Sequence, residues 1–170
     1  YEWSAREHQR EIIGWTDVKR AEDLAAMAQR LRDTRSVPVQ NPSTAIAAAM
    51  VHGARALKSQ SECLQKTLDI SGDGPANIGR HPRDLTPDVI GNITINGLVI
   101  GPDTPSNSTK NRRNLKTLLV YYETFVLRGS GAFAESAQDD EDFATAMKRK
   151  LIRELAPAAV SYLVPSTSGR

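Results

Sequence analysis

The chain has 170 residues, of which 39% are hydrophobic, and this is enough to build one sizeable core. Its 22 basic and 20 acidic residues give a net charge of +2, which is too small a surplus to indicate a polyanionic partner. The single cysteine excludes an internal disulfide and a zinc site made of several thiolates. No apolar run reaches the length of about 18 residues that a membrane span needs. We therefore expect one domain over residues 1–164, followed by a disordered tail over 165–170.

The first half of the chain alternates short apolar runs with helical patterns. Residues 1–4 and 10–15 are predicted strands, which together suggest a hairpin. Apolar residues at helical spacing predict an amphipathic helix over residues 21–32. After a loop that contains two prolines, Ser43 or Thr44 is placed to cap a second helix.

The second half continues the same alternation. Residues 67–71 form a predicted strand that ends at a Gly-Asp-Gly-Pro turn, and residues 93–100, which are rich in β-branched side chains, form a strand expected to lie deep in a sheet. A polar loop over 101–111 precedes a predicted helix over 113–127. A short strand over 132–134 and a helix that begins at residue 140 or 141 complete the pattern.

This alternation predicts an α/β fold with an open, mostly parallel, doubly wound sheet of the Rossmann-like kind and helices on both faces. We expect at least four strands in that one sheet, near Tyr1, Ile12, Leu68 and Ile95. Sheets of this kind bind ligands in the crevice at the carboxyl ends of their strands. The ligand site is therefore expected at that edge.

Basic residues gather at positions 110–116 and again at 148–153. Neither cluster is interleaved with aromatic residues, as a platform for nucleic acid would be. We interpret both clusters as solvated helix faces and expect no nucleic-acid partner.

Two loops stand at the expected carboxyl edge, residues 42–46 and residues 71–74. From the residues alone, Thr44 reads as a helix N-cap and Asp73 as a turn residue that bonds its own backbone. Asp69 lies inside a predicted strand, and we interpret it as a buried structural carboxylate paired with an amide or an arginine.

Seven short motifs in this order and spacing resemble the pattern of an exported bacterial family of unknown role that has a von Willebrand factor A-like fold. The resemblance covers nearly the whole chain, and the fifth motif is the most specific. They are EWS at 2–4, QR at 9–10, WT at 15–16, TAI at 44–46, DISGDGP at 69–75, TINGL at 94–98 and KLIREL at 150–155.

The resemblance implies part of a metal-ion-dependent adhesion site. It makes Thr44 and Asp73, with the neighbouring Ser43, candidate ligands of Mg²⁺ or another divalent cation. The family's DxSxS loop, which supplies the remaining ligands, would lie upstream of Tyr1, so we expect an incomplete site in this chain. The resemblance also implies a periplasmic or secreted protein in which Cys63 pairs with a cysteine ahead of the missing segment.

The leading functional interpretation is a metal-assisted protein-binding module of the bacterial cell envelope, not an enzyme, whose open metal position accepts an acidic residue of a protein partner. Two alternatives stay open. One is a metal-dependent hydrolase that uses Asp69 and Asp73, and the other is a structural subunit completed by another chain. No phosphate-binding loop, nucleophile elbow or zinc-protease motif is present in the sequence.

The chain opens at Tyr1 without a methionine, in what reads as the middle of a strand, and we interpret it as processed or incomplete. In the fold that the resemblance implies, the missing strand lies between the strand at Glu2 and the strand at Leu68. Unpaired strand edges associate readily with other chains. We therefore predict that the chain is unstable alone and that a further segment or a neighbouring molecule fills the gap.

Overall fold

The computed structural model describes residues 1–101 and 109–161, which form two compact units. The first unit contains residues 1–64 and 76–92, and the second contains residues 65–75 and the chain from 93 onward. The proposed tail over 165–170 and most of the predicted loop over 101–111 lie outside the described residues.

Two very short strands open the first unit. Strand β1 (Glu2–Trp3) pairs with β2 (Gln9–Arg10) in antiparallel register, so the predicted hairpin is confirmed. The second strand overlaps the predicted run over 10–15 only at Arg10, and beyond it the Thr16 hydroxyl donates to the Gly14 carbonyl. The hairpin is therefore only a two-residue ladder.

Helix α1 (Ala21–Asp33) matches the predicted helix over 21–32. The Asp23 carboxylate accepts a hydrogen bond from the Arg20 N–H and so satisfies one of the amides left open at the start of the helix. Acidic residues occupy the first turn and basic residues the last, which complements the helix dipole. The apolar residues Leu24 and Leu31 nevertheless stay more than half exposed.

Helix α2 (Ile46–Lys58) carries the predicted apolar face, since Ile46, Met50, Ala54 and Leu57 are all buried. The expected cap is wrong: the N-cap residue is Ala45, and no side chain caps the helix. The 3₁₀ turn η1 (Pro82–Asp84) and the short helix α3 (Pro87–Ile90) pack against α2 within the first unit.

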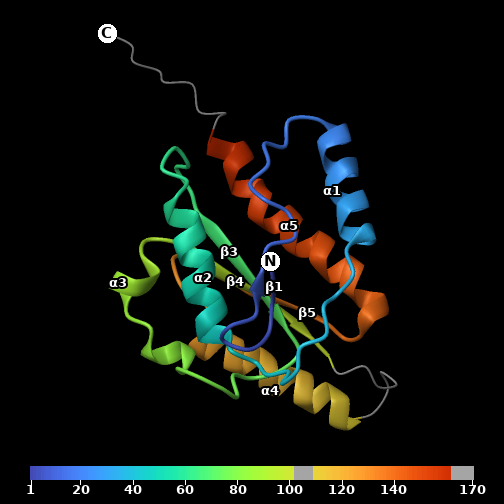
Figure 1. Ribbon diagram of the computed structural model, residues 1–170, viewed down its shortest axis with the longest axis vertical. Helices are drawn as coiled ribbons and strands as arrows, with labels where there is room; N and C mark the ends of the chain where they lie inside the picture. The colour runs from blue at the N-terminus through green and yellow to red at the C-terminus, as the bar shows by residue number, and fades with distance from the viewer. Residues whose placement is uncertain (102–108, 162–170) are drawn as a thin grey trace. The chain divides into compact units, whose positions relative to one another are not determined.

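The second unit is built on a parallel sheet of β3 (Thr67–Gly72), β4 (Thr94–Ile100) and β5 (Ala134–Ala137). Strand β4 lies between the other two, as Figure 1 shows, and both of its ladders are parallel. Five consecutive residues at its centre are buried, which confirms the prediction of a strand covered on both faces.

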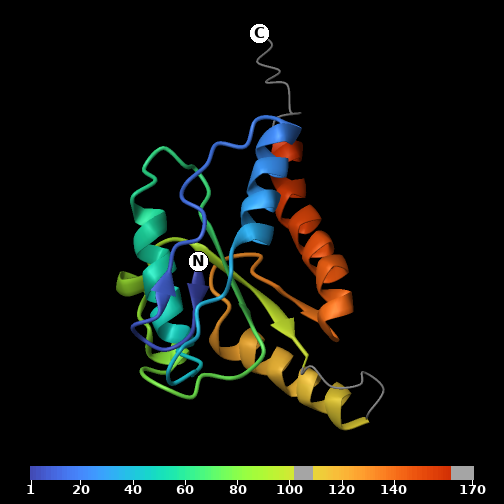
Figure 2. The ribbon, with the colours of Figure 1, turned by 45° about the vertical axis from the view of Figure 1, so that its right-hand side comes forward.

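Helices α4 (Thr109–Phe125) and α5 (Asp140–Ser161) cover opposite faces of this sheet (Figure 2). Successive side chains of a strand point to opposite faces. Leu98 packs with Ala146 of α5, whereas the adjacent position, Gly97, faces Tyr122 of α4. The expectation of an α/β sheet flanked by helices is confirmed at this level.

The expectation that the strands near Tyr1, Ile12, Leu68 and Ile95 lie in one sheet is wrong. Strands β1 and β2 form a sheet of their own, and the described residues place β3, β4 and β5 in a second sheet. The physical reason lies in the short strands: each has two half-buried residues, and the pair includes the charged Glu2 and Arg10. Such a short ladder has no continuous apolar face, and so burial of apolar side chains does not favour its joining a larger sheet.

The carboxyl ends of the parallel strands lie at one edge of the sheet, followed by Asp73, Gly101 and Gln138. The backbones approach closely here, since a Cβ added to Gly101 would lie 2.2 Å from the Gln138 carbonyl oxygen. Only glycine fits at that position.

Candidate functional site

Hydrogen bonds to its backbone groups hold the loop that contains Ser43 and Thr44 in place. The Ser4 hydroxyl donates to the Ser43 carbonyl at 3.0 Å and accepts from the Ser43 N–H at 3.2 Å. The Thr44 N–H donates to the Asn77 side-chain oxygen at 2.8 Å, and the Thr44 carbonyl accepts from the Asn77 N–H. Because these partners occupy the backbone of both residues, the helix begins only after them, with Ala45 as its N-cap.

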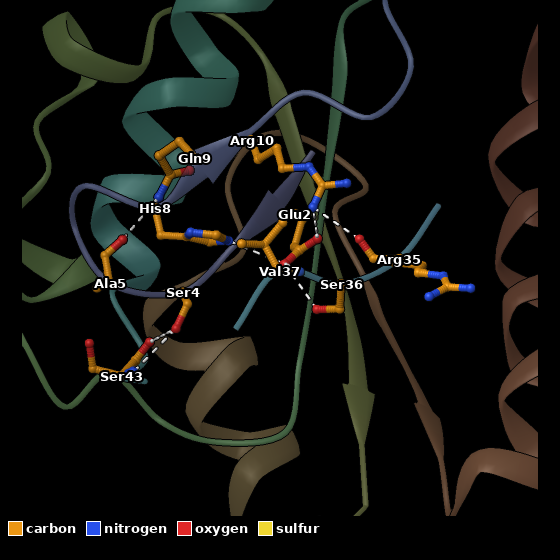
Figure 3. A network of polar contacts seen from close by, with 10 residues as sticks. All are labelled: Glu2, Ser4, Ala5, His8, Gln9, Arg10, Arg35, Ser36, Val37 and Ser43. Atoms are coloured by element: carbon orange, nitrogen blue, oxygen red, sulfur yellow. Dashed lines mark hydrogen bonds and ion pairs between the residues drawn. The ribbon is translucent and has the colours of Figure 1, made fainter. Parts of the chain in front are cut away.

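Glu2 organises the neighbouring loop, as Figure 3 shows. Its carboxylate pairs with His8 at 3.2 Å and with Arg10 at 3.4 Å, and it accepts a hydrogen bond from the Ser36 hydroxyl at 3.0 Å. Partial burial acts to raise the pKa of Glu2, but these hydrogen bonds and the Arg10 charge outweigh it and lower the pKa. Through Glu2, the EWS motif therefore links the β1–β2 hairpin to the segment that precedes Ser43.

The side chain of Ser43 has an unusual environment. Its hydroxyl oxygen is buried and has no hydrogen-bond partner within the described residues. A buried polar atom without a partner costs about 1 to 3 kcal/mol. The Ser43 hydroxyl is therefore a buried oxygen whose hydrogen-bonding capacity is unused within the described residues.

Asp73 directly follows β3 and lines a cavity of about 400 Å³ in the second unit. The end of β4 contributes Ile100, and α4 contributes the remaining wall. Asp73 is exposed, so its carboxylate is accessible at the carboxyl edge of the parallel sheet. The residues that line this cavity are Asp73, Pro75, Ile100, Asn114, Leu115, Thr117, Leu118 and Tyr121.

A second unsatisfied group lies near Asp73. The Tyr122 side chain is fully buried, and its hydroxyl has no hydrogen-bond partner in the described part of the chain. Burial, followed by the negative charge of Asp73, raises the pKa of Tyr122, so its hydroxyl stays protonated. Tyr122 does not line the cavity, so the site itself combines an exposed carboxylate with a largely apolar wall.

Asp69 belongs to a different cluster, on the α5 face of the sheet. Lys150 is completely buried and pairs with both Asp69 and Glu154, the latter at 2.5 Å. The Asn96 amide donates to Glu154 at 2.7 Å, and the Asn96 oxygen accepts from the Phe133 N–H at 3.1 Å. Asp69 was predicted to be buried and paired with an amide or an arginine. Its charge partner is instead a lysine, and its side chain remains about one-third exposed (34%).

The two carboxylates that share Lys150 have pKa values shifted in opposite directions. Desolvation, opposed by the Lys150 charge and reinforced by the Glu154 charge, raises the pKa of Asp69 to about 6. Burial acts to raise the pKa of Glu154 as well, but hydrogen bonds from Lys150, Asp69 and Asn96 lower it. Glu154 is therefore the stable counter-ion of Lys150.

The sequence interpretation of the second basic cluster, 148–153, needs correction. Lys150 is not on a solvated face but fully buried, because two carboxylates neutralise it there. Arg149 interacts with Glu135, and the Arg153 guanidinium lies 3.8 Å from the centre of the Phe133 ring.

The structure brings Ser43 and Thr44 together in the first unit and places Asp73 in the second. A shared cation site for Thr44 and Asp73 stays a prediction. Sequence analysis missed the contribution of α4 to the Asp73 cavity, although Asn114, Leu118 and Tyr121 recur at the spacing of one helix face.

Within residues 1–101 and 109–161, no group of three or more histidine, cysteine, aspartate or glutamate side chains is arranged to hold a metal ion. No helix among these residues is both long and apolar enough to cross a membrane. Cys63 is exposed and has a free thiol.

The fold and the Asp73 cavity define an α/β protein with a candidate ligand site at the carboxyl edge of a parallel sheet. The chain belongs to the family described as "Protein of unknown function (DUF1194)", which it matches over residues 1–159. No curated protein and no solved structure matches the chain.

Proposed function

We propose that the chain is a von Willebrand factor A-like, non-catalytic binding module of the bacterial cell envelope, exported to the periplasm or the exterior. In this proposal it binds a protein partner at the Asp73 cavity with the help of a divalent cation such as Mg²⁺. The observation that carries the proposal is the accessible Asp73 carboxylate, which lines a cavity at the sheet edge where α/β proteins bind ligands.

The oxygen chemistry of the candidate ligands suits a hard cation. Asp73 offers a carboxylate, and Ser43 and Thr44 offer hydroxyls, of which the Ser43 hydroxyl is buried without a partner in the described residues. Mg²⁺ prefers about six oxygen ligands and usually keeps several waters, so a cation bound at the Asp73 carboxylate has room for an acidic group of a partner. A bound cation would supply positive charge that attracts that group.

The chain's own residues would provide the rest of the recognition. Leu118 and Tyr121 line the cavity beside Asp73 and offer apolar contact to the partner's side chain. A cavity of about 400 Å³ is large enough for such an insertion. The hydrolase alternative requires Asp69 to act with Asp73, but Asp69 pairs with Lys150 on the α5 face while Asp73 lines the cavity on the α4 side.

Calorimetric titration with Mg²⁺ and Mn²⁺ tests the proposal. We expect saturable binding by the unaltered chain and a loss of affinity of about tenfold or more in Asp73→Asn, which loses the only charged donor of the set. Glu123→Gln is the matched control, because Glu123 is exposed on α4 and does not line the cavity. Equal affinities in the two variants would contradict the proposal, and metal-dependent turnover of p-nitrophenyl phosphate would favour the hydrolase.

A further inference from the structure

The first unit has a larger cavity, of about 560 Å³, that the proposed function does not use. One face of α2 forms its floor, and the turn between β1 and β2, the loop at residues 78–80 and the segment around α3 form its sides. All of its lining residues belong to the first unit. They are Arg6, Gln9, Ala45, Ala47, Ala48, Val51, His52, Arg55, Ile78, Gly79, Arg80, Leu85 and Val89.

The polar part of this cavity is cationic. Arg6, Arg55 and Arg80 line it, and none of the described residues that form its wall is acidic. The Arg80 side chain donates to the Asp84 carbonyl, whereas the side chains of Arg6 and Arg55 have no hydrogen bond or ion pair within the described residues. Three guanidinium groups around one cavity repel one another, and an anion between them would relieve that repulsion.

His52 adds an unsatisfied group to the same wall. It lies on α2 one turn before Arg55, and the Tyr1 ring packs edge-on against it at 4.6 Å between centroids. Its Nε2 atom is buried and has no hydrogen-bond partner in the described part of the chain. A ligand oxygen at this wall would give that nitrogen a partner.

Gly79 lies close to Arg6, one of the three arginines of the cavity. Gly79 has a φ of +77°, a conformation that side chains rarely adopt, and a Cβ at this position would lie 3.5 Å from the Arg6 stem. The Arg6 stem therefore lies close to Gly79, the residue before Arg80. The remaining wall is apolar and includes Val51 and Leu85.

We propose that this cavity binds a small organic oxyanion, a carboxylate or a phosphate monoester. The anionic head would contact Arg6, Arg55 and Arg80, and the organic body would pack on the apolar wall formed by α2 and α3. A volume of about 560 Å³ falls within the range of small-molecule sites. Guanidinium groups suit both heads because they can donate two parallel hydrogen bonds to either.

Calorimetric titrations with three probes that share a benzene ring test this proposal: phenyl phosphate, phenylacetate and benzyl alcohol. We expect saturable binding of at least one anion, weaker binding at high salt, and no binding of the neutral alcohol. Arg55→Met and Arg6→Met should each weaken binding of that anion about tenfold or more. The anion with the higher affinity identifies the head group.

Lys58→Met is the matched control, because Lys58 is exposed on the same helix and does not line the cavity. It should leave the affinity within about twofold, as should Asp73→Asn, which separates this site from the cation site. Circular dichroism of each variant confirms that the fold is intact. Failure of both anions to bind, equal binding of benzyl alcohol, or an equal loss in Lys58→Met would overturn the proposal.

Discussion

Lys150 shows how one buried charge organises three separate segments of the second unit. Its ammonium has no exposed surface, and it contacts Asp69 of β3 and Glu154 of its own helix, while Asn96 of β4 donates to Glu154. Removing one partner of a buried ion is costly, because the remaining charge is left without compensation. The cluster therefore specifies how α5 is positioned on the sheet.

The two carboxylates should respond to neutralisation in different ways. Glu154→Gln should lower the free energy of unfolding by about 1 to 3 kcal/mol at neutral pH, since the more buried carboxylate, with the lowered pKa, is lost. Asp69→Asn should cost less than about 1 kcal/mol, because Asp69 is one-third exposed and the fold favours its neutral form. Urea denaturation of both variants measures this, and the reverse order would contradict the assignment.

The pH dependence has a definite sign. Because the fold raises the pKa of Asp69 from 3.8 to about 6, the stability that it contributes is complete below pH 3.8 and is lost as the pH rises through about 6. The free energy of unfolding of the unaltered chain, minus that of Asp69→Asn, should therefore fall between about pH 4 and pH 6. Urea titrations across this window check it, and a constant difference would show that the carboxyl is not perturbed.

At the scale of elements, β4 fits tightly between its covering helices. A Cβ on Gly97 would lie 2.9 Å from Cδ1 of Tyr122 and 3.4 Å from Cβ of Ala134. Gly97→Ala should therefore destabilise the protein by about 1 to 3 kcal/mol through overpacking. Gly14→Ala is the control, since its nearest neighbour is the end of the flexible Glu11 side chain. Chemical denaturation should show a lower midpoint only for Gly97→Ala.

The sequence predicted the elements with strong patterns. The β-branched run at 94–100 indicated the central strand of the second unit, and helical spacing indicated α1 and α2 of the first. The last strand was predicted over 132–134 but spans Ala134–Ala137. The hairpin strands were misplaced because residues 10–15 contain apolar side chains without alternation. Tertiary contacts decide which sheet a two-residue strand joins, and no local sequence pattern encodes them.

The candidate site was predictable only in part. The turn after residues 67–71 indicated Asp73, because carboxyl ends of parallel strands meet at one edge. The burial of Lys150 and the arginine cavity of the first unit depend on contacts between segments far apart in the chain, such as Arg6 with Gly79. Charge runs in a sequence do not reveal such pairings.

At the scale of the whole molecule, the outer edge of β3 bears on the alternative that the chain is a structural subunit completed by another chain. Within the described residues β3 pairs only with β4, so its other edge has no strand partner. If a further segment or another chain normally covers this edge, the chain of 170 residues should associate with itself as its concentration rises. Light scattering during size-exclusion chromatography measures this, and a monomer at every concentration would contradict the expectation of a missing strand.

The division into two units is discontinuous in the sequence, since residues 65–75 of the second unit lie between two segments of the first. This arrangement gives each unit a cavity of its own, around Asp73 in one and around the arginines in the other. The two proposals can therefore be tested independently on the same protein.

Paramagnetic broadening by Mn²⁺ tests the central claim, a divalent-cation site at Asp73, most directly. In a nuclear magnetic resonance titration of the labelled chain, we predict that the amide signals of residues 72–74 broaden first and that excess Mg²⁺ restores them. The Asp73→Asn variant should not show this selective loss. Broadening confined to other acidic residues, or none at stoichiometric Mn²⁺, would contradict the account.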